Sequence, residues 1–151
     1  MNQFVTKRFG PISTGQRCWR AAAEATWVRG YGRIVEITFL DEHDSSGANI
    51  LNTETLDMID QWLNAQWNNR ILIAHDDPLL PEFQSLHELG GCNINIMQPK
   101  YGPGIESACE FVYDGVDNII FNERGRTDRV KQVQVWEHEG NSSTYDTFPP
   151  Q

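Results

Sequence analysis

The chain has 151 residues, a formal net charge of −9 and 39% hydrophobic residues. This length predicts one domain over residues 1–151 with a real core, and the composition excludes disordered and fibrous classes. The negative charge argues against general binding of nucleic acid, because Lys and Arg make most phosphate contacts. No apolar run approaches the roughly 20 residues that span a bilayer, and three cysteines without C-x-x-C spacing favour a reducing compartment. We therefore expect a cytoplasmic protein that does not contact membranes.

Positive charge is concentrated near the N-terminus. Residues 1–34 contain six of the twelve basic residues and one acid, which gives +5, whereas the other residues carry −14. The stretch RGYGR (29–33) places two of these arginines beside two glycines at the start of an alternating apolar run. Two interpretations are open: an anion site within an acidic surface, or arginines that pair with acids elsewhere in the fold.

Two strands and a helix are predicted in the first half of the chain. Alternating apolar and polar residues predict strands at Gln3–Gly10 and Arg33–Asp41, paired antiparallel across a loop at Pro11–Gly32. Residues 53–67 place apolar side chains on one helical stripe, with Asn52 or Thr53 as the N-cap. The stripe comprises Leu56, Ile59, Trp62, Leu63 and Trp67.

The second half predicts a short helix that ends at Gly90, a strand at NINIM (93–97) and a long helix from Ile105 to about Phe121. Strands at Val130–Glu137 and Thr144–Phe148 close the chain. This order predicts an α+β fold, with two long helices on one face of a mainly antiparallel sheet. Exposed sheet edges in such a fold favour pairing between subunits.

No motif by itself identifies a metal or nucleotide site. The four histidines are scattered without H-x-H or H-E-x-x-H spacing, and no Walker or G-x-G-x-x-G sequence is present. His75 and His138 have neighbouring carboxylates that could build a metal site, but positions in a turn and an edge strand explain them better.

Six sequence stretches, taken together, indicate a protein family more specifically than any single motif does. They are STGQR (13–17), VRGYGRIVEITF (28–39), LNAQWNNRILI (63–73), DDP (76–78), YGPGIES (101–107) and VQVWEHE (133–139). In order and spacing they resemble the 6-pyruvoyltetrahydropterin synthase and 6-carboxytetrahydropterin synthase family over nearly the whole chain. The sequence is most similar to a divergent branch that is often phage-borne. The resemblance implies the tunnelling fold, in which sheets of several subunits join into a barrel. We expect a hexamer built from trimers, in a bacterial cell and encoded by it or by its phage.

The resemblance also implies where the family binds its catalytic zinc. The three zinc-binding histidines correspond here to Gln16, Arg29 and Tyr31. A guanidinium has no lone pair to donate and keeps its positive charge, so Arg29 would repel the ion. We therefore predict no metal and no other cofactor.

The family's catalytic positions have changed as well. By resemblance, the family cysteine corresponds to Ala25, and the Asp-His pair corresponds to Asn68 and Asn69. Alanine and amides cannot replace general acids and bases, whose contribution is typically about 10²- to 10⁴-fold in rate. We therefore expect a chain without the family's activity.

The positions that bind the ligand have been retained. Glu106 and Glu137 correspond to glutamates that hold the pterin, and a carboxylate accepts two parallel N–H bonds from an amino-imine edge. Arg17, Arg29 and Arg33 would lie near the anionic end of the ligand. For Glu106 a purely structural role in the first turn of a helix is also open.

Three functions from different classes follow. We favour a catalytically degenerate homo-oligomer that binds a pterin- or guanine-like anionic ligand without zinc. The second is an active lyase on 7,8-dihydroneopterin triphosphate that uses relocated groups such as His75 and Cys18. The third is an oligomer that serves assembly or interaction with a protein.

Overall fold

The computed structural model describes residues 3–22, 26–41 and 51–148. Within these residues the strands are β1 (Gln3–Arg17), β2 (Arg29–Asp41), β3 (Arg70–Ala74), β4 (Ile94–Met97), β5 (Val130–His138) and β6 (Asn141–Asp146). The helices are α1 (Thr53–Trp67), α2 (Leu80–Glu88) and α3 (Ile105–Arg124). The strands form one sheet in the order β4-β3-β1-β2-β5-β6.

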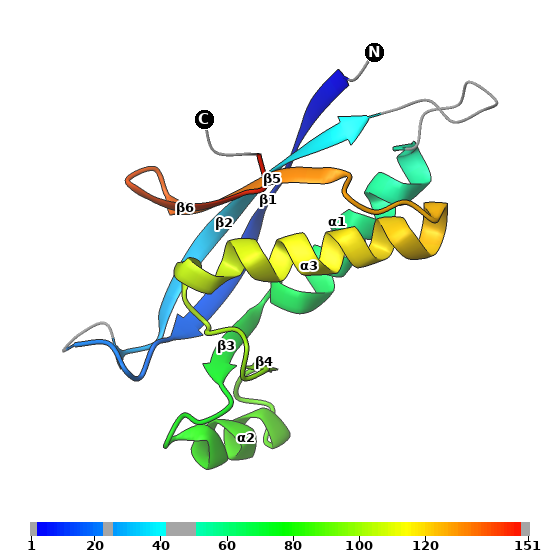
Figure 1. Ribbon diagram of the computed structural model, residues 1–151. Helices are drawn as coiled ribbons and strands as arrows, with labels where there is room; N and C mark the ends of the chain where they lie inside the picture. The colour runs from blue at the N-terminus through cyan, green and yellow to red at the C-terminus, as the bar shows by residue number, and fades with distance from the viewer. Residues whose placement is uncertain (1–2, 23–25, 42–50, 149–151) are drawn as a thin grey trace.

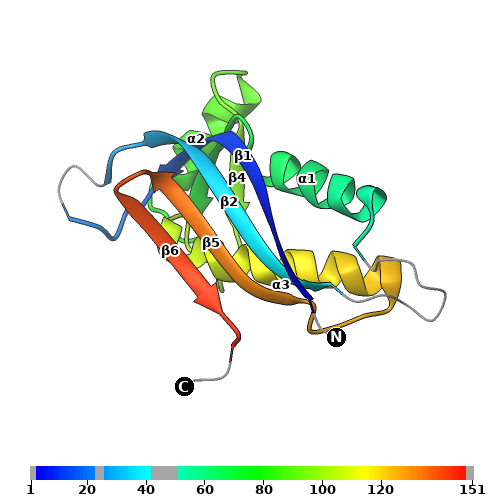
Figure 2. The same ribbon diagram turned by 90° about the horizontal axis from the view of Figure 1, so that it is seen from above.

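The long strands curl, and α1 and α3 both lie on one face of the sheet (Figures 1 and 2). The core between these layers is apolar: α1 contributes Ile59 and Leu63, and α3 contributes Val112 and Val116, all fully buried. Asn52 caps α1, as the sequence predicts, because its side chain accepts a hydrogen bond from the amide of Thr55. The predicted α+β architecture is therefore confirmed.

The two N-terminal strands are longer than the sequence predicts. β1 and β2 pair antiparallel from Gln3 opposite Asp41 to Gln16 opposite Arg29, so the predicted loop at Pro11–Gly32 is wrong. Glycine and serine have low strand propensity, but the backbone hydrogen bonds of the neighbouring strands hold them in the ladder. The stretch RGYGR consequently lies inside β2 rather than before it.

The predicted strand order lacked β3. Its apolar residues form too short a run to distinguish a strand from a buried helical turn by periodicity alone. In the structure β3 runs parallel to both β1 and β4, so the sheet is mixed rather than purely antiparallel. The ends of α3, β5 and β6 also differ from the predicted ends by a few residues.

A bulge in β1 decides which side chains face the helices. Phe9 lies opposite Val35 and Ile12 opposite Arg33, so β1 contains one extra residue between these pairs. Gly10 occupies the bulge with φ of 100°, a conformation that favours glycine. The inward face therefore changes from odd to even positions along β1, and Gln16 faces inward with Arg33.

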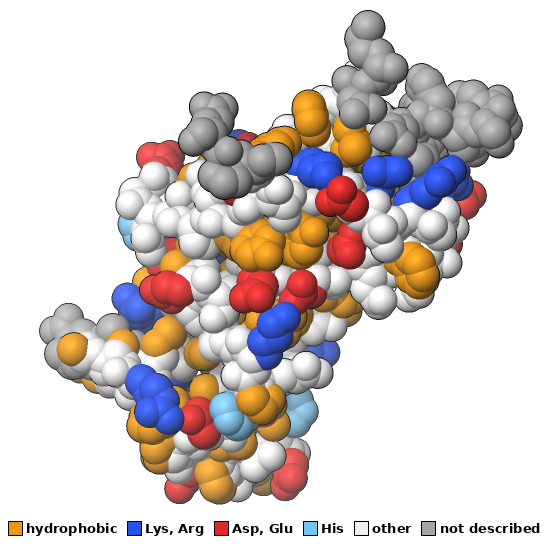
Figure 3. Space-filling model, in the orientation of Figure 1, with side chains coloured by type: hydrophobic (Ala, Val, Ile, Leu, Met, Phe, Trp, Pro, Cys, Tyr) orange, Lys and Arg blue, Asp and Glu red, His pale blue; other side chains and the backbone are white. Residues whose placement is uncertain are grey.

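Helix α2 lies outside this core. None of its residues is buried, and Leu86 and Leu89 are exposed. On the face shown in Figure 3, hydrophobic and histidine side chains gather over α2. Acidic side chains lie across the middle of this face, where Figure 1 shows α3. The residues that position the site come instead from the long strands, from the end of β3 and from the start of α3.

Candidate functional site

Three neighbouring strands bring Gln16, Arg33 and Glu137 together on the inward face of the sheet. The Gln16 Nε2 donates to Glu137 Oε1 at 2.9 Å, and the Gln16 Oε1 accepts from Arg33 Nη2 at 2.6 Å. The amide of Gln16 therefore connects a buried cation to a buried anion. We refer to Arg33, Gln16 and Glu137 as the buried network; the exposed Asn141 adds a hydrogen bond from Nδ2 to Glu137 Oε2 at 2.8 Å.

Arg33 is only 1% exposed, and its guanidinium lies with Cζ 4.7 Å from the ring centre of Trp67. It also donates to the carbonyl of Pro103 at 2.9 Å. Burial lowers the pKa of Arg33 to about 10, against the opposing effect of the Glu137 carboxylate. This pKa is still far above neutral, so Arg33 stays charged and the network contains a compensated pair of charges.

Beside the buried network lies a cavity of about 440 Å³, which we call the Arg29 cavity. The residues that line it include Gln16, Cys18, Arg29, Tyr31, Glu106, Glu137 and Asn141. All three predicted zinc positions and both predicted recognition glutamates therefore meet in one place. Its volume lies in the range of about 300–1,000 Å³ that is usual for small-molecule sites.

Two charged groups that line this cavity, Arg29 and Glu106, have no polar partner within the described part of the chain. No hydrogen bond or ion pair joins the side chain of Arg29 or Glu106 to another residue in the described part of the chain. The closest aromatic contact of Arg29 is with Tyr31, whose ring centre lies 5.8 Å from Cζ. A guanidinium and a carboxylate that no described side chain pairs with thus line the same cavity.

A second cavity of about 310 Å³, which we call the Trp19 cavity, adjoins the first. Its lining includes Trp19, Arg20, His75, Asp76, Pro99, Tyr101 and Pro103. Cys18 and Glu106 line both cavities. Burial, followed by the nearby Glu106 carboxylate, raises the pKa of the Cys18 thiol, which favours its protonated form.

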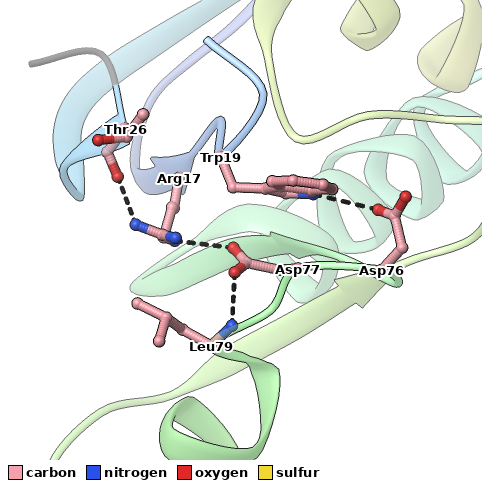
Figure 4. A network of polar contacts seen from close by, with 6 residues as sticks. All are labelled: Arg17, Trp19, Thr26, Asp76, Asp77 and Leu79. Carbon is pink, nitrogen blue, oxygen red and sulfur yellow. Dashed lines mark hydrogen bonds and ion pairs between the residues drawn. The ribbon is translucent and has the colours of Figure 1, made fainter. Parts of the chain in front are cut away.

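The turn after β3 forms hydrogen bonds with the end of β1 and with the residues that follow it. Asp76 accepts from Trp19 Nε1 at 3.2 Å and from Arg20 Nη2 at 2.7 Å. Asp77 accepts from Arg17 Nε at 2.8 Å, and Arg17 also donates to the carbonyl of Thr26 at 2.7 Å (Figure 4). Arg17 therefore holds the loop and does not line either cavity, although the sequence places it near the ligand.

The predicted catalytic positions lie elsewhere or outside the description. Asn68 caps the C-terminus of α1, and Asn69 adopts a positive φ of 58° before β3. Both are exposed, and neither lines the two cavities. Ala25 lies outside the described residues.

The residues at the three zinc positions do not fit zinc. Both polar atoms of the Gln16 amide are engaged in the buried network, and Arg29 offers only donors. Zinc prefers thiolate, imidazole or carboxylate ligands in a tetrahedral arrangement. In residues 3–22, 26–41 and 51–148, no group of three His, Cys, Asp or Glu side chains is arranged to hold a metal ion.

Sequence reasoning missed Asn141 and Trp19 as parts of the site. Asn141 begins β6 directly after the β5–β6 turn, so its approach to Glu137 follows from hairpin pairing that the sequence predicts only roughly. For Trp19 the available signal was its place in the stretch CWR after β1, beside the retained DDP turn.

The curled sheet with two long helices on one face defines the class of this protein, the α+β tunnelling fold. A family model described as 6-pyruvoyl tetrahydropterin synthase matches residues 5–147, and the chain belongs to that family. Membership relates the chain to pterin-related lyases. None of the curated proteins compared with the chain matches it.

Solved structures share the fold at low sequence identity. An uncharacterized protein of Wolinella succinogenes is 14% identical with a TM-score of 0.76, covering 98% of this chain and 99% of that chain. The 6-pyruvoyl tetrahydropterin synthase of Plasmodium falciparum is 8% identical with a TM-score of 0.64, covering 98% and 99%. That of Caenorhabditis elegans is 11% identical with a TM-score of 0.54, covering 98% and 96%. At these identities the likeness shows the fold alone.

None of the described helices is long and apolar enough to cross a membrane. The structure contains one copy of the chain, so the expected assembly into a hexamer stays a prediction, as do the cytoplasmic location and phage origin.

Proposed function

We propose that this chain binds a pterin- or guanine-like ligand with an anionic group, without zinc and without the lyase reaction of its family. The observation that carries the proposal is that Arg29 and Glu106, neither of which has a hydrogen-bond or ion-pair partner among residues 3–22, 26–41 and 51–148, line one cavity. A ligand with a donor edge and an anionic end would satisfy both groups.

Glu106 supplies the acceptor for the ring. The amino-imine edge of pterin or guanine presents two parallel N–H donors, which match the two oxygens of a carboxylate. Glu106 sits in the first turn of α3, where the helix dipole favours its negative charge. The structural role that the sequence leaves open is thus compatible with binding.

Arg29 supplies the contact for the anion. A guanidinium binds phosphate or carboxylate through two N–H donors and remains charged at all physiological pH values. The rest of the chain is acidic, so a free arginine in a cavity is a local exception to the repulsion of anions.

In this proposal Glu137 and Arg33 do not contact the ligand but hold the wall of the cavity in place. Both oxygens of Glu137 already accept protein hydrogen bonds, and Arg33 is buried behind Gln16. The Gln16 amide joins them at a position that a zinc ligand holds in the family. The buried network would therefore give the cavity its shape without a metal.

Calorimetric titration with pterin, guanine and GTP tests the proposal. Glu106→Gln should weaken all three by about 10- to 100-fold, because a hydrogen bond to a charged group is lost. Arg29→Gln should weaken GTP and leave pterin and guanine unchanged.

Two matched variants control for charge. Glu110→Gln removes an acid one turn further along α3, and Arg8→Gln removes a surface arginine that pairs with Glu36. Both should bind all three probes like the unmodified chain. Absence of heat with every probe would overturn the proposal.

A second function, the active lyase, is favoured by one observation: Cys18 and His75 line the same cavity as Glu106. The raised pKa of Cys18 suits a proton donor better than a thiolate. Incubation with 7,8-dihydroneopterin triphosphate and analysis of products tests it. Turnover that is abolished by Cys18→Ser would support the lyase, and an inactive chain would eliminate it.

A further inference from the structure

A third cavity, which we call the Trp136 cavity, lies on the face of the sheet that α1 and α3 leave uncovered (Figure 2). On β2 the buried side chains at positions 33, 35 and 37 face the helices, so Gly32 and Ile34 face the other way. The volume of about 470 Å³ is usual for a small-molecule site. The lining residues are Arg8, Gly32, Ile34, Trp136, His138 and Glu139.

Gly32 leaves the floor of this cavity open. Ile34 lies directly opposite Trp136 across β2 and β5, and both side chains are half-buried. A Cβ atom at residue 32 would lie 3.3 Å from Cβ of Pro11, so a side chain there would fill the space beside this pair. The apolar surface of Ile34 and the indole of Trp136 therefore stay accessible to a flat ligand.

Arg8 supplies a guanidinium of which only one contact is used. Its Nη1 donates to Glu36 Oε1 at 3.1 Å, and Arg8 forms no other hydrogen bond with the described part of the chain. Its Cζ lies 5.7 Å from the ring centre of Trp136. The remaining N–H donors can bind a carboxylate whose ring lies on the indole, because a guanidinium both pairs with carboxylates and packs beside aromatic rings.

Two acids limit the charge that this cavity accepts. Glu36 already pairs with Arg8, and Glu139 lines the cavity without a polar partner among residues 3–22, 26–41 and 51–148. A triphosphate would bring several negative charges close to these carboxylates, whereas a single carboxylate needs only the free donors of Arg8. The charges therefore favour a ligand with one negative charge.

We infer that the Trp136 cavity binds a planar aromatic monocarboxylate, with its ring on Trp136 above Gly32 and its carboxylate on Arg8. The inference does not rest on the proposed function. The Trp136 cavity lies on the opposite face of the sheet from Gln16 and Glu137, and of the residues that line the Arg29 cavity it shares His138 alone.

Calorimetric titration of the unmodified chain with indole-3-acetate and its neutral analogue indole-3-acetamide tests the inference. The acetate should bind about tenfold more tightly, because the amide lacks the hydrogen-bonded charge contact with Arg8. Arg8→Gln should remove this difference by weakening the acetate alone.

Two further variants test where the ring lies. Trp136→Ala should weaken both probes by about tenfold, because both lose the aromatic contact, and should leave GTP binding unchanged. Trp27→Ala is the matched control, because Trp27 is 64% exposed and does not line the Trp136 cavity. Gly32→Val fills the floor with a residue of high strand propensity and should abolish binding of both probes.

The two proposals fail separately. The inference is overturned if indole-3-acetate gives no heat at millimolar concentration, binds no more tightly than the amide, binds Trp136→Ala unchanged, or is displaced by GTP. None of these outcomes affects the proposed function. If indole-3-acetate binds as expected while pterin, guanine and GTP give no heat, the proposed function is overturned and the Trp136 site stands.

Discussion

Glu137 and Glu106 contribute the same functional group to one cavity, yet their surroundings are opposite. Glu137 lies on a central strand, is buried, and accepts a hydrogen bond at each oxygen. Glu106 lies at the start of α3, is exposed, and has no hydrogen-bond partner among the described residues. A buried carboxylate must be satisfied internally, whereas an exposed one is available to a ligand.

The arginines of β2 show the same contrast. Arg33 is compensated through Gln16 and packed on Trp67, while Arg29 faces the cavity four residues earlier on the same face of the strand. The position along β2 therefore decides the role of each arginine: Arg33 stabilises the fold, and Arg29 is a candidate contact for the ligand. The following changes would break or sharpen this comparison.

The largest effect is expected for Glu137→Leu. This change leaves the Arg33 charge uncompensated and the donors of Gln16 and Asn141 without their acceptor, so the free energy of unfolding should fall by about 3 kcal/mol. Urea denaturation measures it. The matched change Glu106→Leu should cost only about 0.5 kcal/mol, from a helix first turn at the surface. Equal losses for the two glutamates would contradict the comparison.

A smaller effect is expected for Asn141→Ala. Glu137 loses one of its two donors, but the exposed position of residue 141 lets water replace it. The free energy of unfolding should fall by about 1 kcal/mol, measured by the same denaturation. A loss as large as that of Glu137→Leu would mean that Asn141, rather than Gln16, is the main partner of the carboxylate.

The contact of Asp76 with Trp19 and Arg20 should depend on pH, with an effect smaller again. Hydrogen bonds from Arg20 and then Trp19 hold the pKa of Asp76 below its usual range. The stabilisation is therefore present above the ordinary pKa of an aspartate and is lost as pH falls through the lower folded value.

The charged groups that face Asp76 are Arg20 and His75, whose Nδ1 lies 3.9 Å from Oδ1. The measurement is the difference in unfolding free energy between the unmodified sequence and Asp76→Asn, both carrying His75→Gln. It should stay constant from pH 8 to about 4 and shrink below that. A difference that vanishes already near pH 6 would contradict this assignment.

No effect is expected from metal. Because a ligand that binds only the folded chain raises its thermal midpoint, EDTA should not lower the midpoint and added zinc should not raise it. Differential scanning calorimetry with metal analysis measures both. Zinc retained at one ion per chain after purification would refute the prediction.

Much of the fold was predictable from periodicity. The stripe of α1 and its Asn52 cap, the long helix α3 and the alternation of β2 and β5 follow from the sequence because each element buries one regular face. The strand β3 and the full length of β1 were not predictable, since their place depends on neighbouring strands rather than on local pattern.

The sequence predicted which residues form the site better than it predicted the role of each residue. The family resemblance indicated Gln16, Arg29, Tyr31, Glu106 and Glu137, and the structure brings these five residues to one cavity. It also indicated Arg17, which instead pairs with Asp77 outside both cavities. Resemblance identifies a position in the chain, but the direction and partners of a long side chain depend on what packs around it.

By itself, the sequence predicted, through its family resemblance, which groups this protein has lost and kept: a guanidinium, an amide and a phenol at the three predicted zinc positions, and two glutamates at the predicted ligand positions. Only the tertiary structure decided which of the kept groups are free. The bulge at Gly10 turns Gln16 inward, and the adjacent strands then place it between Arg33 and Glu137. Gln16 and Glu137 are 121 positions apart in the chain, and no local sequence pattern records such a pair of hydrogen-bond partners.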